Sequence, residues 1–272
     1  MNIFEKLLAY RNDNGSFLRL FLHKITKGKI KRPLLNRRLT NITHSARRIN
    51  QLNLKSNYKY LEIGVSYGLT LEGVNSNFKF AVDPSPKYTQ NKTNTSTKTF
   101  SMTSNVFFDG LPVNSIFDVI FLDGLHTKEQ LLLDFINSIK HINEDSWILI
   151  DDIVPRDSIS AIPDQHESYN SRIKVNQTNT VWHGDCYKIL PILKKYFSEF
   201  HQFLIIYPDN PQLLVRLRQG AKIPIISSFD LEKYIKEMNS FQYLDSFTSK
   251  VMSSYDLWVE DHLFAHLKEQ IN

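Results

Sequence analysis

The sequence has little cysteine and no long apolar run, and both absences narrow what it can be. The one cysteine among its 272 residues, Cys186, cannot form an intramolecular disulfide, which fits a reducing compartment and predicts a cytoplasmic protein. The longest apolar stretch near the start, residues 17–22, is interrupted by Arg19 and is far shorter than the ~20 residues that span a bilayer. No small-residue cleavage site follows it, so we expect neither a secretory signal nor an integral membrane segment.

Acidic residues are missing from residues 24–48, although the whole chain has a net charge of only +5. Nine Lys or Arg residues fall in this segment, so it could contact a membrane surface, a nucleic acid or an anionic substrate. Aromatic residues are also missing there, which argues against nucleic acid, because single-strand binders stack bases on aromatic rings. A solvated helical face is the simpler interpretation.

From residue 57 the pattern changes to short apolar runs that alternate with helical stretches. Nearly continuous apolar strands separated by helices are typical of a parallel sheet covered on both faces. The last two runs are joined by a turn so short that one of them must be antiparallel. We therefore expect a doubly wound, mostly parallel α/β sheet of seven strands, with one antiparallel strand from a late hairpin. The runs are residues 58–64, 78–83, 98–102, 117–123, 147–152, 202–207 and 212–218.

Helical patterns flank this core on both sides. Residues 1–56 predict a basic, helical N-terminal extension that acts as a lid or a subunit contact, and in the second case the protein is a homo-oligomer. Residues 57–220 form the predicted main domain, and residues 221–272 predict a helical C-terminal extension.

The most informative segment is YLEIGVSYG at residues 60–68, an apolar strand that breaks into a glycine-bearing turn. Gly64 allows a sharp turn close to a ligand, and Gly68 allows the following helix to pack closely. Asp83 follows 19 residues after Gly64, at the end of the next strand, where its carboxylate can accept two hydrogen bonds from a ribose diol. This arrangement predicts a nucleoside-binding site.

Two other functions fit the same turn. An NAD-dependent sugar oxidoreductase or epimerase is one, but Gly-x-Gly-x-x-Gly is absent and the bulky Tyr67 stands where a pyrophosphate needs close backbone approach. A non-catalytic binding protein that keeps the fold and binds a partner through its basic first 55 residues is the other.

A second cluster of polar residues follows the fourth and fifth strands. Asp123 ends the fourth, Asp151 and Asp152 end the fifth, and three carboxylates so close together repel one another unless a cation or protons intervene. Oxygen ligands favour a hard ion such as Mg²⁺. His126 stands beside them, and its ordinary pKa near ~6.5 suits removal of a proton from a hydroxyl. Alternatively, His126 caps a helix and Asp152 binds backbone.

Four segments in order resemble the motifs of class I S-adenosylmethionine-dependent methyltransferases, in the branch that includes small-molecule and sugar O-methyltransferases. They are YLEIGVSYG at 60–68, VDP at 82–84, FDVIFLDGLH at 117–126 and WILIDD at 147–152. The resemblance covers about residues 57–220 and implies methyl transfer from S-adenosylmethionine to a hydroxyl of a sugar or other small acceptor. A sugar acceptor would fit polysaccharide biosynthesis.

The resemblance also implies roles for single residues. Glu62 would lie near the methionine part of the cofactor, Asp83 would bind its ribose, and Met102 and Thr103 would flank its adenine. The full set of residues that would bind the cofactor comprises Glu62, Gly64, Gly68, Asp83, Met102, Thr103 and Asp123. The catalytic residues would be His126, as the base, and Asp123. Asp123, Asp151 and Asp152 would bind Mg²⁺. Many relatives have His-Asp in place of Asp151-Asp152, which is a departure. A segment at residues 182–188 resembles Trp-x-Gly-Asp-x-x-Lys, with no role that the sequence explains.

Overall fold

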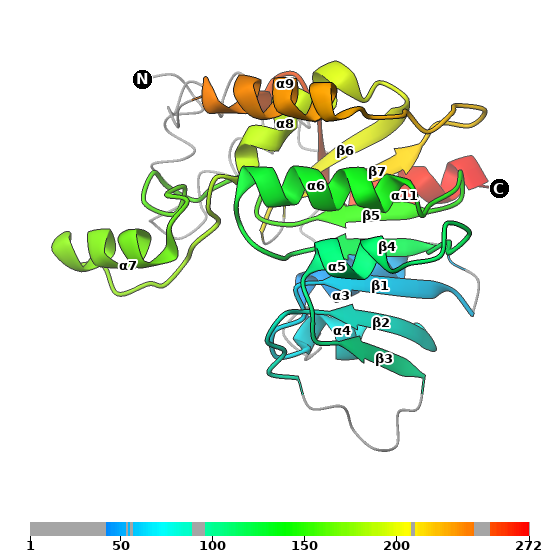
Figure 1. The fold of residues 1–272 in the computed structure, drawn as a ribbon, viewed down its shortest axis with the longest axis horizontal. Helices are drawn as coiled ribbons and strands as arrows, with labels where there is room; N and C mark the ends of the chain where they lie inside the picture. Colours follow the sequence, from blue (N-terminus) through cyan, green and yellow to red (C-terminus); the bar gives the residue numbers. More distant parts are fainter. Residues whose placement is uncertain are drawn as a thin grey trace.

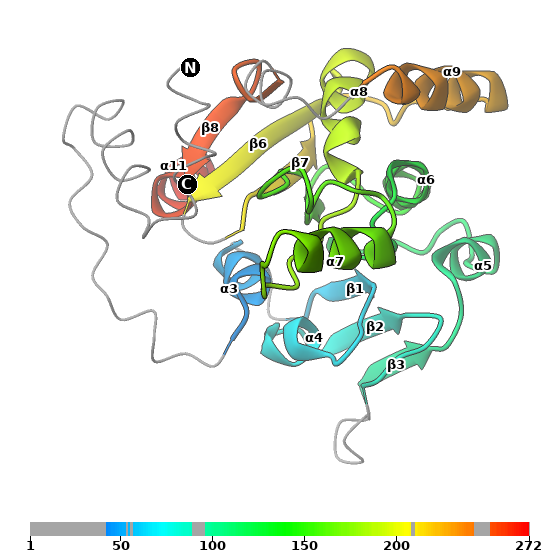
Figure 2. The same ribbon diagram turned by 90° about the vertical axis from the view of Figure 1, so that its left-hand side faces the viewer.

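An eight-stranded sheet forms the centre of the protein, seen in a computed structural model that describes residues 42–52, 54, 57–88, 96–207, 210–241 and 251–271. The strands are β1 (Lys59–Ile63), β2 (Phe78–Val82), β3 (Thr97–Phe100), β4 (Val119–Leu122), β5 (Trp147–Ile150), β6 (Phe200–Tyr207), β7 (Gln212–Leu217) and β8 (Asp256–Val259). Their order across the sheet is β3-β2-β1-β4-β5-β7-β6-β8. Figure 1 labels β1 to β7, and Figure 2 shows β8 beside β6.

The predicted architecture is confirmed in its main features. Strands β3, β2, β1, β4 and β5 pair in parallel, whereas β7 runs antiparallel to both of its neighbours, β5 and β6. The late hairpin therefore supplies the one antiparallel strand of the described sheet. The expected count of seven strands was wrong by one, because β8 from the C-terminal extension pairs in parallel with β6. With four residues, a polar start at Asp256 and a helix directly after it, β8 lacks the apolar run that identified the others.

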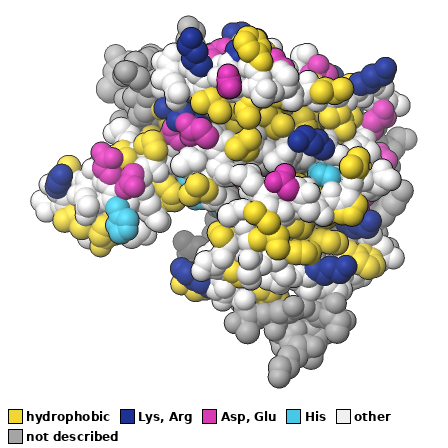
Figure 3. All heavy atoms as spheres, in the orientation of Figure 1, with side chains coloured by type: hydrophobic (Ala, Val, Ile, Leu, Met, Phe, Trp, Pro, Cys, Tyr) yellow, Lys and Arg dark blue, Asp and Glu magenta, His cyan; other side chains and the backbone are white. Residues whose placement is uncertain are grey.

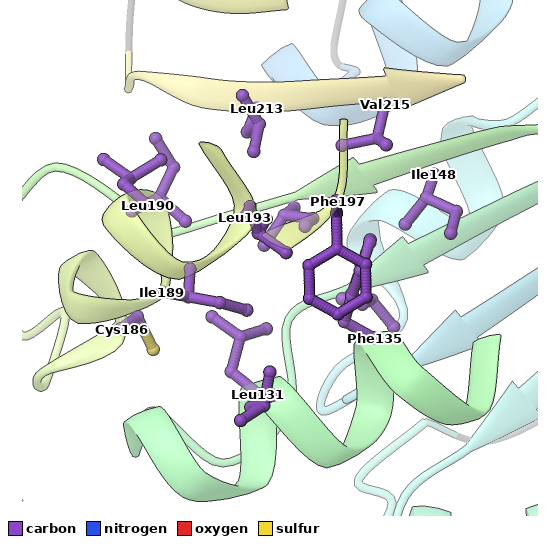
Figure 4. Close-up of a cluster of buried hydrophobic side chains, with 14 of the residues drawn as sticks. Leu131, Phe135, Ile148, Cys186, Ile189, Leu190, Leu193, Phe197, Leu213 and Val215 are labelled. Carbon is purple, nitrogen blue, oxygen red and sulfur yellow. The ribbon is translucent and has the colours of Figure 1, made fainter. Parts of the chain in front are cut away.

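Helices cover both faces of the sheet (Figures 1 and 2). One face packs on α5 (Ser104–Asp109), α6 (Lys128–Ile139), α8 (Ile189–Tyr196) and α9 (Ser228–Asn239), which bury one hydrophobic cluster. The other face packs on α3 (His44–Gln51), α4 (Leu69–Gly73) and α11 (Glu260–Ile271), which bury a second cluster. Figure 4 shows Leu131 and Phe135 of α6 meeting Ile189 and Leu193 of α8 in the first cluster, beside the buried Cys186.

Helix α3 belongs to the predicted N-terminal extension, and two of its basic residues are used inside the protein. Arg47 and Arg48 both form ion pairs with Glu260 at the start of α11, at 2.8 and 3.0 Å. Arg48 is 1% exposed, and its Nη1 also donates to the backbone oxygen of Asn210. Breaking a buried pair of this kind costs about 3–5 kcal/mol, so α3 is held firmly against the sheet. Residues 1–41 lie outside the described part, and the lid or subunit contact stays a prediction.

Helix α7 (Gln165–Lys174) projects from the body of the protein at the left of Figures 1 and 3. Its N-cap Asp164 accepts from Glu167 N, and the buried Arg172 binds Asp157 and the backbone oxygen of Val181, which ties both ends of the projecting segment together. None of the described helices is both long and apolar enough to cross a bilayer.

Candidate active site

A cavity of about 750 Å³ opens at the carboxyl ends of the parallel strands. This is the edge where open α/β sheets bind ligands, and the volume falls within the ~300–1,000 Å³ typical of small-molecule sites. Each of four strands contributes residues that directly follow it: Gly64 and Ser66 after β1, Asp83 after β2, Asp123 and His126 after β4, and Asp151 and Asp152 after β5. The structure therefore brings these predicted residues together around one cavity.

Gly64 forms the tight turn at the centre of this edge. Its amide donates to Val82 O at 2.9 Å, and the amide of Asp123 donates to Ile63 O at 2.9 Å, so the ends of three strands are bound together there. Its φ is +86°, and a Cβ at this position would lie 1.9 Å from the backbone oxygen of Asp123. Only glycine combines that conformation with that contact, so Gly64 allows the turn after β1 to pack directly against the backbone that follows β4.

Asp83 is held in place by the backbone of two loops. Its Oδ2 accepts from Ser66 N and its Oδ1 accepts from Ser85 N, each at 2.8 Å. A carboxylate has about four acceptor sites, so two remain for a ligand in the cavity. A fixed carboxylate with free acceptor sites fits the two hydroxyls of a ribose.

His126 lies between two carboxylates. Its Nε2 is 3.4 Å from Asp123 Oδ1, and its Nδ1 is 3.1 Å from Asp152 Oδ2, an ion-pair contact whose alignment is not that of a hydrogen bond. Burial lowers the pKa of His126, but the hydrogen bond to Asp123 and the charges of Asp152 and Asp123 outweigh it and raise the pKa to about 9. In this arrangement the imidazole is a charged bridge that offsets the repulsion between the carboxylates.

Asp151 and Asp152 point to different partners although they are adjacent. Asp152 has a left-handed backbone, with φ +55°, and its side chain faces His126. Asp151 Oδ1 instead accepts from Asp152 N at 2.8 Å and from Asn210 Nδ2 at 3.0 Å, and its Oδ2 lies 3.8 Å from His44 Nε2.

The residues that could hold one cation therefore differ from the predicted set. Asp123, His126 and Asp152 each offer a ligand atom within 4.8 Å of the others, whereas Asp151 is not in this group. Successive side chains of a strand point to opposite sides, and the side chains of Asp151 and Asp152, which directly follow β5, have different partners. Two carboxylates without the imidazole suit Mg²⁺, while all three donors also suit Mn²⁺ or Zn²⁺.

The comparisons with known proteins agree with this geometry. Residues 61–153, which run from β1 to just beyond β5, match a family model described as a methyltransferase domain. These residues form a methyltransferase domain, the kind of domain that the four sequence motifs resemble. The free acceptor sites of Asp83 fit the ribose of S-adenosylmethionine, the cofactor that this resemblance implies. A comparison with curated proteins finds no match.

Several solved structures resemble the methyltransferase at low identity. A cofactor-bound protein from MTB, Rv0187, has 15% identity, covers 76% of this chain and 99% of its own, and gives a TM-score of 0.46. An O-methyltransferase from Bacillus cereus, in complex with SAH, has 11% identity, covers 65% of this chain and 82% of its own, and gives a TM-score of 0.44. A putative O-methyltransferase from Klebsiella pneumoniae has 11% identity, covers 72% of this chain and 94% of its own, and gives a TM-score of 0.42.

Three predicted cofactor residues of the methyltransferase do not line the cavity. Glu62 is 2% exposed and accepts from Tyr60 Oη at 2.6 Å; burial raises its pKa to about 8, against the lowering effect of that bond. Gly68 packs against the ring of Tyr88 instead: a Cβ added at this position would lie 2.3 Å from a ring carbon. Met102 packs against the hydrophobic cluster, whereas the adjacent predicted residue, Thr103, does line the cavity and caps α5.

The segment at residues 182–188, whose role the sequence left open, braces the His126 loop of the methyltransferase. The Trp182 ring stacks on the His126 ring with centroids 4.7 Å apart. Gly184 has φ +61°, and a Cβ there would lie 1.7 Å from His126 O. Asp185 Oδ1 accepts from Lys128 N at 2.8 Å, which caps the first turn of α6. Each residue of the segment therefore has a physical role: Trp182 stacks on His126, Gly184 allows close approach of the backbone, and Asp185 caps α6.

Sequence reasoning missed several cavity residues because they come from outside the four motifs. His44 comes from α3 and Asn210 from the turn before β7, and both contact the acidic pair. Asp134 lies on the buried face of α6, beside Leu131 and Phe135. An acid within an otherwise apolar helical stripe was the available signal for Asp134, since such positions rarely hold an acid without a reason.

Proposed function

We propose that this methyltransferase transfers the methyl group of S-adenosylmethionine to a hydroxyl oxygen of a sugar or another small polyhydroxylated acceptor. The observation that supports this most is the group of Asp123, His126 and Asp152 in the same cavity as Gly64 and Asp83. Carboxylates and an imidazole side by side can bind hydroxyls and accept the proton that one of them loses.

The proposed roles follow from position. Asp83 binds the ribose of the cofactor, and the Gly64 turn lets the cofactor lie against the backbone. When bound, the cofactor supplies a methyl group that is already activated by its positive sulfur. His126 would accept the proton that the acceptor hydroxyl loses as its oxygen receives that methyl group. Holding the two reactants in line supplies much of the acceleration.

We include a divalent cation in the proposal. The carboxylates of Asp123 and Asp152 would hold it, as Mg²⁺ is commonly held by one or two carboxylates with water and substrate oxygens. It would polarise and orient the acceptor hydroxyl. With that charge beside the carboxylates, a neutral His126 is free to accept the proton.

The decisive experiment combines ligand binding with turnover. Isothermal titration with S-adenosylhomocysteine and with NAD separates the proposal from the oxidoreductase alternative, and methyl transfer to a panel of sugars and polyols separates it from a non-catalytic protein. For His126→Gln we expect turnover to fall by about 10²–10⁴-fold, the usual share of a general base, with affinity for S-adenosylhomocysteine kept within about twofold. Unchanged turnover would remove His126 from the mechanism.

A cytoplasmic location and a homo-oligomeric state remain predictions from the sequence. Of the nine basic residues at 24–48, two bind Glu260 within the protein, and the rest lie outside the described residues. The proposal therefore includes a small-molecule acceptor as the partner and no nucleic acid.

A further inference from the structure

A second cavity, of about 230 Å³, lies beside α7 and adjoins the active-site cavity. Gln165, Thr180 and Trp182 line both cavities, so the two meet at these residues. Helix α7 extends past the carboxyl edge of the sheet, where the larger cavity opens (Figures 1 and 2). The second cavity is smaller than the ~300–1,000 Å³ of a complete small-molecule site, so its size suits one ring-sized part of a larger molecule.

Trp182 separates the second cavity from the proposed base by the thickness of one ring. One face of the indole stacks on His126, with centroids 4.7 Å apart. Its Nε1 donates to Ile162 O at 2.8 Å, which fixes the ring in the wall that the two cavities share. A molecule whose hydroxyl reaches His126 can therefore continue past Trp182 into the second cavity.

The wall of the second cavity offers aromatic surface and no negative charge. Tyr169 of α7 is 51% exposed, so much of its ring is open to a ligand. The CH groups of a pyranose ring carry partial positive charge, which matches the negative face of an aromatic ring. Among the described residues, those that line this cavity include His166 and Arg172 but no acid, which argues against a cationic ligand.

Arg172 adds a buried donor to this wall. It is 1% exposed, and its two terminal nitrogens donate to Asp157, Gln177 Oε1 and Val181 O. Its Nε has no hydrogen-bond partner in the part of the chain that the structure describes. The Asp157 carboxylate already balances the positive charge of Arg172, at 3.0 Å. The remaining N–H therefore matches a neutral acceptor such as a hydroxyl better than a second anion.

We propose that the second cavity binds a neighbouring sugar residue of the acceptor, so that the substrate is an oligosaccharide or a glycoside with at least two sugar rings rather than a monosaccharide. This inference rests on the proposed function. The sugar ring that is methylated lies at His126, and the next ring lies past Trp182, toward Tyr169. Because the second ring does not react, its contacts strengthen binding of the acceptor and chiefly lower KM.

The test is methyl-transfer kinetics with paired acceptors. The probes are methyl glycosides of glucose, galactose and mannose, each paired with the methyl glycosides of its α- and β-linked homodisaccharides. For at least one pair we expect the wild-type protein to have a kcat/KM at least about tenfold higher for the disaccharide, mainly through a lower KM. Isothermal titration of that pair onto protein saturated with S-adenosylhomocysteine should show the same preference in Kd.

Two variants remove side chains that line the second cavity and not the first. Tyr169→Ala should reduce the preference to within about threefold, by raising the KM for the disaccharide. His166→Ala should narrow the preference severalfold. The matched control is Ile173→Ala, which removes a large side chain that is 54% exposed one turn further along α7 and does not line the cavity. This control should keep the wild-type ratio.

The outcomes separate the inference from the proposed function. A wild-type protein that uses both members of every pair equally well would overturn the inference and leave the proposed function standing. A wild-type ratio in both Tyr169→Ala and His166→Ala would do the same. If the wild-type protein neither methylates nor binds any of these sugars, the sugar acceptor of the proposed function fails, and the inference fails with it.

Discussion

Gly184→Ala isolates the contribution of the segment that braces His126. The φ of +61° alone costs a non-glycine residue about 1–2 kcal/mol. The added Cβ would also lie 1.7 Å from His126 O, far inside any real contact, so the two backbones must separate by more than 1 Å. That shift pulls Asp185 from Lys128 N, a charged hydrogen bond worth roughly 1.5–3 kcal/mol. We therefore expect a loss of about 2.5–5 kcal/mol in the free energy of unfolding.

The catalytic effect should be larger than the effect on cofactor binding. A displacement of about 1 Å at a reacting group costs about 10²-fold in rate, so we expect kcat for methyl transfer to fall by that order. Affinity for S-adenosylhomocysteine should stay within about threefold, because Gly64 and Asp83 belong to other strands and lie apart from the brace. The measurements are urea denaturation, isothermal titration and methyl-transfer kinetics on the same preparation.

Gly220→Ala is the matched control. Gly220 also has a left-handed backbone, with φ +73°, but nothing lies within 4 Å of the Cβ that alanine would add. It should lose only the conformational cost and keep kcat. If the two variants have equal stability and equal kcat, the contact between Gly184 and His126 does not position the imidazole, and the account of this segment is wrong.

Two further predictions concern charge in and below the cavity. Burial raises the pKa of Glu62 to about 8 from 4.5, so the folded protein holds this proton more tightly than the unfolded chain, and the resulting stability is full below pH 4.5 and lost as pH rises through about 8. The measurement is the difference in free energy of unfolding between Glu62→Gln and the wild-type protein at about pH 5 and at about pH 8. This difference should shift in favour of the variant by roughly 2–4 kcal/mol from the lower pH to the higher. An equal difference at the two pH values would contradict the account of Glu62 as a buried acid. Exhaustive EDTA treatment should abolish methyl transfer and Mg²⁺ should restore it, whereas full activity in chelator would remove the cation from the proposal.

The fold and the centre of the site could be predicted because they depend on local signals. Buried parallel strands are apolar runs, and the residues at their carboxyl ends meet at one edge whatever the rest of the chain does. Gly64, Asp83, Asp123 and His126 follow such strands directly, so their convergence followed from topology. Strand β8 gave no comparable signal, because its pairing with β6 depends on packing rather than on its own four residues.

The orientation of side chains could not be predicted in the same way. Whether Asp151 or His126 joins the other two carboxylates depends on the left-handed backbone at Asp152 and on Asn210, which approaches from a distant turn. Likewise, Glu62 follows the family motif, yet its side chain is satisfied by Tyr60 and does not reach the cavity. Motif spacing locates a residue on the sheet, but hydrogen-bond partners from elsewhere determine where it points.

The chain segments outside the matched methyltransferase domain complete the acidic side of the cavity. Arg48 Nη1 donates to Asn210 O at 2.7 Å, and Asn210 Nδ2 donates to both Asp151 and Asp152, at 3.0 and 3.1 Å. Arg48 is itself fixed by Glu260 of α11. A continuous set of charged and polar contacts therefore links α3 and α11, the first and last described helices, to the carboxylate that faces His126. The extensions are thus part of the site's architecture, because the acidic pair takes its orientation from residues that they hold.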